Sequence, residues 1–127
     1  MELSSRFTIN RHLIIVVPGQ PAVDWVNSVE QGPGAVTLAE LRDELDAHLV
    51  PTSISGRIEA ERWVLLNWDV YFESFLEEWY MDQSLWPKKR TKKMFKEWFE
   101  VRFHSMVFDL AAGQPIEYED WGESDDD

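Results

Sequence analysis

The stretch HLIIVVPGQPAVDWVNSV, residues 12–29, contains the first strand and the first helix that the sequence predicts. Its first part, residues 12–17, is rich in β-branched side chains and predicts a buried strand, which Pro18 and Gly19 end. Pro21 suits the first turn of a helix. The apolar side chains that follow recur at helical spacing and predict one buried face: Ala22, Trp25, Val26 and Val29.

Two more helices follow the break at residues 31–34. Thr37 and Glu40 form a capping box that predicts a helix over TLAELRDEL. The strongest helical pattern then runs from Ser55 to about Tyr80. Its expected inward side chains are Ile58, Leu65, Trp68, Phe72, Phe75, Leu76 and Trp79.

The remaining strands are shorter patterns. Residues 48–54 have strand-like composition, but Pro51 cannot donate to a ladder, so we expect a short strand at a sheet edge. Thr91 can cap a further helix that ends near Phe99. Residues 100–110 fit a helix or a strand, and we favour the strand because a helix would leave Val101 and Phe108 in water.

This order of elements predicts an α+β fold: a small, mostly antiparallel sheet of about three strands with helices packed on one face, a two-layer sandwich. We expect one globular domain over residues 1–121. Residues 117–127 carry seven acidic side chains, and residues 122–127 are expected to form a flexible acidic tail.

The composition narrows the functional classes. The chain has 127 residues, a formal net charge of −12, seven Trp and no cysteine. The absence of cysteine excludes disulfides, thiolate metal sites and cysteine nucleophiles. The apolar run at residues 13–17 is too short for a signal-peptide core or a membrane span, so we expect a cytoplasmic protein without membrane contact.

Three stretches, PAVDWVNS, SLWPKKRT and FKEWFEVRFHSMVFDL, resemble a family of uncharacterised small acidic bacterial proteins. The resemblance covers most of the chain, from about Arg11 to Glu119. It implies a bacterial cytoplasmic setting, and it brings no activity, cofactor or catalytic residue with it.

A basic cluster stands out against the negative charge of the chain. It holds half of the 12 basic residues within nine positions: Lys88, Lys89, Arg90, Lys92, Lys93 and Lys96. The N-terminal turn of a helix disfavours cations, so helix stability does not explain them. With Trp86 beside them, they could bind nucleic acid, dock an acidic protein, or balance carboxylates of the same chain. The net charge disfavours direct nucleic-acid binding.

A second candidate binding group is Asp24, Trp25 and Asn27, because aromatic residues beside polar ones are common at interfaces. Asp24 can also favour the helix N-terminus, and Asn27 can satisfy a loop backbone.

No catalytic or metal site is expected. His104, Ser105 and Asp109 are types used in nucleophilic catalysis, but in a strand His104 and Ser105 point to opposite faces and no nucleophile elbow is present. His12 and His48 are isolated in the sequence and belong to no metal motif.

We therefore expect a non-enzymatic interaction or regulatory domain that binds another protein, a basic one by charge, through an acidic, aromatic-rich surface. One alternative is a nucleic-acid mimic that inhibits a DNA- or RNA-binding protein. Another is a small enzyme with a carboxylate and histidine site in a cleft. No cofactor is expected. A homodimer becomes an option if these aromatic side chains form an exposed patch: Trp63, Tyr71, Tyr80, Trp86 and Trp121.

Overall fold

The centre of the fold is a three-stranded antiparallel sheet. The computed structural model describes residues 7–29, 34–111 and 113–119. Within them the strand order is β3-β2-β4, and β1 and β5 form a two-stranded sheet at one end. The strands are β1 (Phe7–Thr8), β2 (His12–Pro18), β3 (Ala47–Val50), β4 (Phe99–His104) and β5 (Phe108–Asp109).

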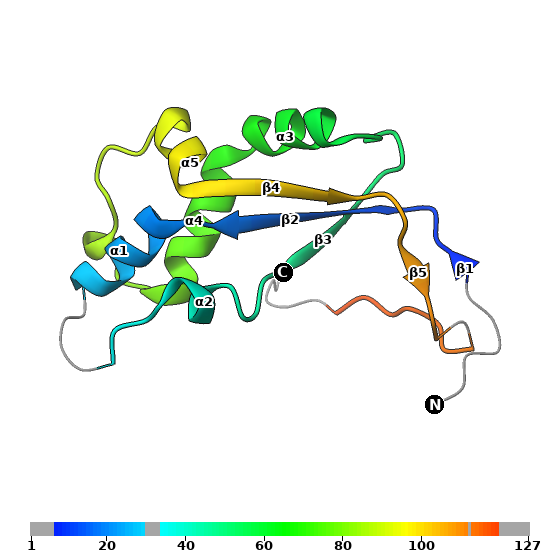
Figure 1. Cartoon of the computed structure of the whole chain (residues 1–127), viewed down its shortest axis with the longest axis horizontal. Coiled ribbons are helices and arrows are strands. Elements are labelled where there is room, and N and C mark those ends of the chain that lie inside the picture. Colours follow the sequence, from blue (N-terminus) through cyan, green and yellow to red (C-terminus); the bar gives the residue numbers. More distant parts are fainter. Residues whose placement is uncertain (1–6, 30–33, 112, 120–127) are drawn as a thin grey trace, which may run out of the picture.

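The helices pack against this sheet, with α4 crossing behind it and α3 lying near β4 (Figure 1). The predicted α+β class with a small antiparallel sheet is confirmed. In the part of the chain that the structure describes, the helical elements are α1 (Gln20–Val29), α2 (Leu38–Leu41), α3 (Arg57–Leu66), α4 (Trp68–Trp79), the short 3₁₀ helix η1 (Gln83–Leu85) and α5 (Lys92–Trp98). No helix among these residues is long and apolar enough to cross a membrane.

The junction between β2 and α1 is formed by Gly19. Its N–H donates to the carbonyl of Trp98 at 2.7 Å, and its own carbonyl accepts the N–H of Ala22 at 3.0 Å. A Cβ at Gly19 would lie 3.3 Å from the Trp98 oxygen, which is a tight contact. The glycine therefore lets the end of β2 approach the end of α5 closely while α1 begins.

The prediction of a single helix from Ser55 to Tyr80 is wrong, because the helix is interrupted at Asn67. The backbone of Asn67 has φ −121° and ψ 29°, outside the α-helical region. Its side-chain amide donates to the carbonyl of Trp63 at 3.1 Å. Asparagine competes for backbone hydrogen bonds in this way, and the sequence pattern did not register that competition.

The interruption at Asn67 also changes which side chains of α3, the first of the two helices, point into the core. Ile58 was expected to point inward, but it is 66% exposed. Ala60 and Val64 of α3 are buried instead. The apolar pattern of α4 was correctly assigned at Phe72 and Leu76, which are both fully buried.

Two other boundaries differ from the predictions. The capping box of Thr37 and Glu40 is present, but α2 ends at Leu41. The strand expected at 48–54 is the shorter β3, which lies at a sheet edge as predicted and stops at the residue before Pro51.

The ambiguous segment after α5 is a strand, as favoured. Thr91 caps α5 by accepting the N–H of Met94, and β4 begins at Phe99. The strand is not continuous to residue 110, because it ends at His104 and pairing resumes at Phe108. The predicted tail at residues 122–127 lies outside the described residues, as does Trp121.

Phe72 lies at the centre of the core. It is fully buried, and its ring contacts four other aromatic rings at centroid distances of 5.1–6.4 Å. They belong to α4, α5 and β4: Trp68, Phe95, Trp98 and Phe99. This aromatic cluster holds α4 against the sheet.

Replacing Phe72 by Ala should therefore lower the free energy of unfolding by about 3–5 kcal/mol, because it leaves a cavity inside the cluster. Urea unfolding followed by tryptophan fluorescence measures the change. Val70→Ala, on the same helix at a position that is 60% exposed, is the matched control and should change stability by less than about 0.5 kcal/mol. Equal losses in the two variants would contradict the central role of Phe72.

Candidate functional site

One concave surface of the described residues is an open groove of about 1130 Å³. One wall is α4, and the other is the segment that runs from α2 to β3, residues 40–48. Val16 and Pro18 of β2 contribute to the lining. In Figure 1, α2 lies beside the C-terminal end of α4. The groove is thus built from segments that are distant in the sequence.

The lining of the groove is strongly acidic. It includes no lysine or arginine from the described residues. Its carboxylates come from both walls: Glu40, Asp43, Glu44, Asp46, Glu77 and Glu78. Charges of one sign in a concave, partly desolvated site reinforce one another, so the groove attracts cations.

Aromatic side chains line the same groove. Trp63 and Tyr71 lie edge to face with ring centroids 6.2 Å apart, and His48 of β3 meets Tyr71 in the same way at 5.5 Å. Phe75 and Trp79 extend this lining along α4. Burial raises the pKa of Tyr71 above its ordinary value, so its hydroxyl stays neutral at physiological pH. Such rings can hold the methylene stem or the charged head of a cationic side chain.

Two of the carboxyl groups, those of Glu78 on α4 and Asp46 before β3, interact across the groove. Partial burial, hydrogen bonding with Asp46 and the negative charge of Asp46 together raise the pKa of Glu78 to about 7. The pair therefore holds a proton near neutral pH that an isolated glutamate would have lost.

Sequence reasoning did not single out Asp46 or Glu78. Neither residue belongs to a motif, and they lie on different elements. With 24 acidic residues in the chain, no spacing rule distinguishes this pair from the others.

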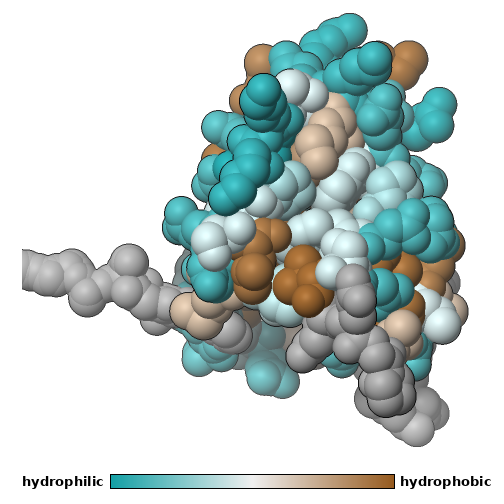
Figure 2. Space-filling model, turned by 90° about the vertical axis from the view of Figure 1, so that its left-hand side faces the viewer, coloured by the Kyte–Doolittle hydropathy of each residue, from teal (hydrophilic) through white to brown (hydrophobic). Residues whose placement is uncertain are grey.

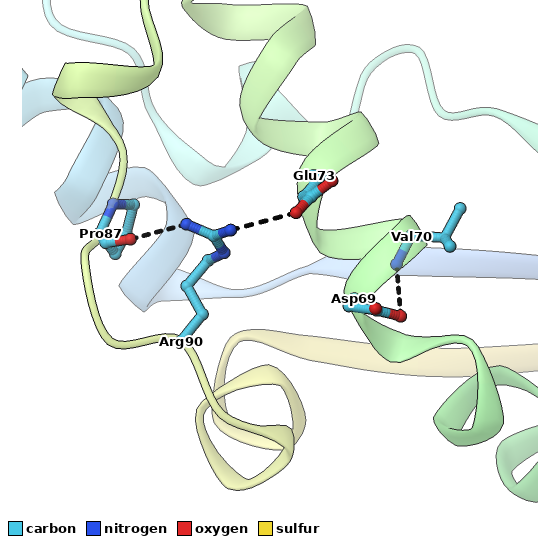
Figure 3. A network of polar contacts seen from close by, with 5 residues as sticks. All are labelled: Asp69, Val70, Glu73, Pro87 and Arg90. Carbon is cyan, nitrogen blue, oxygen red and sulfur yellow. Dashed lines mark hydrogen bonds and ion pairs between the residues drawn. The ribbon is translucent and has the colours of Figure 1, made fainter.

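The predicted basic cluster divides into two parts in the structure. Arg90 points inward: it donates to the carbonyl of Pro87 at 2.8 Å and to the carboxylate of Glu73 on α4 at 3.1 Å (Figure 3). Its guanidinium also lies 5.6 Å from the ring centroid of Trp86. Arg90 therefore attaches the loop before α5 to α4.

The lysines of the cluster point outward. Lys88 donates to the carbonyl of Ser84 at 3.3 Å. The other four are exposed and make no hydrogen bond or ion pair with a described residue: Lys89, Lys92, Lys93 and Lys96. Figure 2, which views the molecule from the side that carries α1, shows hydrophilic side chains gathered over the upper part, the level at which α5 lies in Figure 1. We call these four side chains the lysine row.

Trp86, proposed as an exposed partner of the cluster, is only 8% exposed. Its indole N–H donates to the carbonyl of Tyr80 at 2.7 Å. Trp63, Tyr71 and Tyr80 are half-buried. The described members of the suggested exposed aromatic patch are therefore largely covered by the fold.

The second candidate group has structural contacts of its own. The indole N–H of Trp25 donates to the carbonyl of Leu85 at 3.2 Å. Asn27 exchanges two hydrogen bonds with the backbone of Val36, at 2.9 and 3.0 Å. Asp24 is exposed and accepts a hydrogen bond from Gln20. These contacts account for Trp25 and Asn27 as parts of the fold.

His12 and His48 contact different residues of the fold. His12 is within hydrogen-bond distance of the Ile54 carbonyl at 2.6 Å, and His104 is exposed at the end of β4. Within residues 7–29, 34–111 and 113–119, no three His, Asp or Glu side chains are grouped to hold a metal ion.

The chain matches no protein-family model, and no curated protein or solved structure shows significant similarity to it. The resemblance to small acidic bacterial proteins stays an expectation. The site must therefore be interpreted from its own geometry.

The Asp46–Glu78 contact predicts a pH-dependent stability. The folded protein keeps a proton on Glu78 between its usual value of 4.5 and about 7, so stability should fall as the pH rises through this window and then level off. Glu78→Gln removes this dependence. The unfolding free energy of the variant relative to the wild type should rise by only about 1 kcal/mol between pH 5 and pH 8, because the Glu78 carboxyl is partly exposed to solvent.

Urea unfolding at several pH values measures this gain. Glu77→Gln is the matched control, since Glu77 precedes Glu78 on the same helix and also lines the groove. The unfolding free energy of Glu78→Gln relative to this control should rise as the pH is raised from 5 to 8. A difference between the two variants that stays constant over this range would contradict the assignment.

The inward contacts of Arg90 also predict a difference within the basic cluster. Arg90→Ala should destabilise the protein by about 1 kcal/mol, because it removes two hydrogen bonds and the cover of the Trp86 ring. Lys89→Ala, which removes the same charge from an exposed neighbour, should have almost no effect. Urea unfolding of both variants makes the comparison, and similar effects would argue against an internal role for Arg90.

Proposed function

We propose that the protein is a non-enzymatic interaction domain whose groove binds a cationic segment, rich in lysine or arginine, of a protein partner. The observation that supports this most directly is the lining: six acidic side chains and no lysine or arginine among the described residues, around an open volume of about 1130 Å³. A lysine or arginine that enters this groove meets carboxyl groups from both walls.

The aromatic lining adds a second source of affinity. A lysine stem packs against apolar rings while its ammonium group stays near carboxylates or over a ring face. Trp63, Tyr71 and Trp79 offer such surfaces. An all-polar acidic surface would attract cations but would not retain the methylene groups.

Nucleic-acid mimicry is less well supported by this arrangement. An imitation of the phosphate backbone requires carboxylates along an exposed ridge that can enter the binding groove of another protein. Here the six lining carboxylates surround a concavity. A convex basic ligand fits that shape better than a DNA-binding cleft does.

A second candidate function, an acid–base enzyme, is favoured by the Asp46–Glu78 contact. Two carboxyls that share a proton can activate water, as in aspartic proteases. We place this candidate second because a carboxyl pair alone does not define a substrate.

Calorimetric titration with a blocked peptide of alternating lysine and glycine tests the proposal. We expect binding that weakens as salt is raised, and no binding of the matching glutamate–glycine or glutamine–glycine peptides. The recovered lysine peptide should be intact by mass spectrometry. Cleavage would move the enzyme candidate to first place.

Matched charge variants locate the binding site. Glu44→Gln with Glu77→Gln removes one carboxylate from each wall and should weaken binding about fivefold. Asp24→Asn with Glu97→Gln removes the same charge from exposed positions outside the groove and should change affinity by less than about twofold. Equal effects would mean that only the overall charge attracts the peptide.

A further inference from the structure

The lysine row is a basic surface for which the described fold provides no partner. Its side chains are exposed, and Phe95 and Trp98 of the same helix are buried against the core. Two of the lysines, Lys92 and Lys93, stand in the first turn of α5, where the helix dipole disfavours cations. Neither packing nor helix stability therefore accounts for the row.

The row and the groove are built by different parts of the chain. The lysines belong to α5 and to the loop before it, whereas the groove is lined by α4, by residues 40–48 and by parts of the sheet. Glu73 of α4 holds Arg90 and thereby the loop that leads to α5 (Figure 3). None of the four lysines is among the residues that line the groove, so the row of the same copy does not occupy it.

We propose that a second copy of this chain supplies the cationic segment, so that the lysine row of one molecule binds in the acidic groove of the next. This inference rests on the proposed function of the groove. Its support is charge complementarity: four exposed lysines without a described partner and a groove lined by six carboxylates. The aromatic lining of the groove packs against the lysine stems.

The contact joins two different surfaces, so it is head to tail. Each contact leaves one free groove and one free lysine row, and the assembly grows into a ring or an open chain. Two copies with a formal charge of −12 each repel one another at long range. At about 0.15 M salt the screening length is about 8 Å, so this repulsion is reduced while pairs inside the contact are screened less.

Charge-swapped variants of the full chain test the inference by sedimentation velocity. The row variant is Lys92→Glu with Lys93→Glu, two changes that suit the N-terminal turn of α5 and should leave the fold intact. The groove variant is Glu44→Lys with Glu77→Lys, at two exposed positions. We expect the wild type to associate reversibly at about 0.1 mM and each variant alone to stay monomeric.

Mixing the two variants should restore association, because the row variant keeps an acidic groove and the groove variant keeps a basic row. Association of the wild type that persists in either variant alone, or that mixing fails to restore, would overturn the head-to-tail contact. A monomeric wild type at every concentration would overturn it too.

The lysine–glycine peptide separates this inference from the proposed function. The row variant retains its groove and should bind the peptide as the wild-type groove does, and the peptide should dissociate wild-type assemblies. A wild type that binds the peptide but stays monomeric contradicts only the self-association. A wild type that neither binds the peptide nor associates with itself contradicts both proposals.

Discussion

The packing of Phe72 against the junction of α5 and β4 is the interaction on which the rest of the structure depends. Trp98 ends the helix and Phe99 begins the strand, and both rings contact Phe72. One buried side chain thus connects α4 to a helix and to the sheet at once. Because α4 forms a wall of the groove and Phe99 also lines it, the shape of the candidate site depends on this packing.

The acidic side chains of the groove and the exposed lysines lie on different elements of the fold. The acidic side chains of the groove come from α2, α4 and the segment before β3, and the exposed lysines come from α5 and the loop before it. Arg90, although it belongs to the same run of basic residues, is mostly buried and bonded to Glu73. In the part of the chain that the structure describes, a molecule with a large net negative charge therefore presents an acidic concavity and, on other elements, a group of exposed lysines.

The strands and the core could be predicted where the local sequence pattern is typical of only one type of secondary structure. The β-branched run of residues 12–17 predicted a strand, which forms the centre of the sheet with Ile14 and Val17 fully buried. Pro51 correctly limited its own strand to an edge. Asn67 was missed because apolar side chains continue at helical spacing on both sides of it. Its effect comes from a hydrogen bond to Trp63 that a periodic pattern does not include.

The groove could not be predicted, because its walls come from residues 40–48 and 63–79, which have no shared motif. The basic cluster was visible in the sequence, but its division into an inward arginine and outward lysines depends on where Glu73 and Trp86 lie. Composition identified the chemistry of the two surfaces, whereas only the tertiary structure shows which residues share a surface.

The position of β2 in the sheet also bears on how the chain is made. β2 leaves the ribosome before both of its partners, and β4 follows only after all the described helices have been made. Until then β2 can pair only with the short edge strand β3, and a two-stranded pairing is marginal in water. The apolar run at residues 13–17 therefore stays incompletely covered until β4 has been made, and an exposed apolar strand can aggregate with other nascent chains.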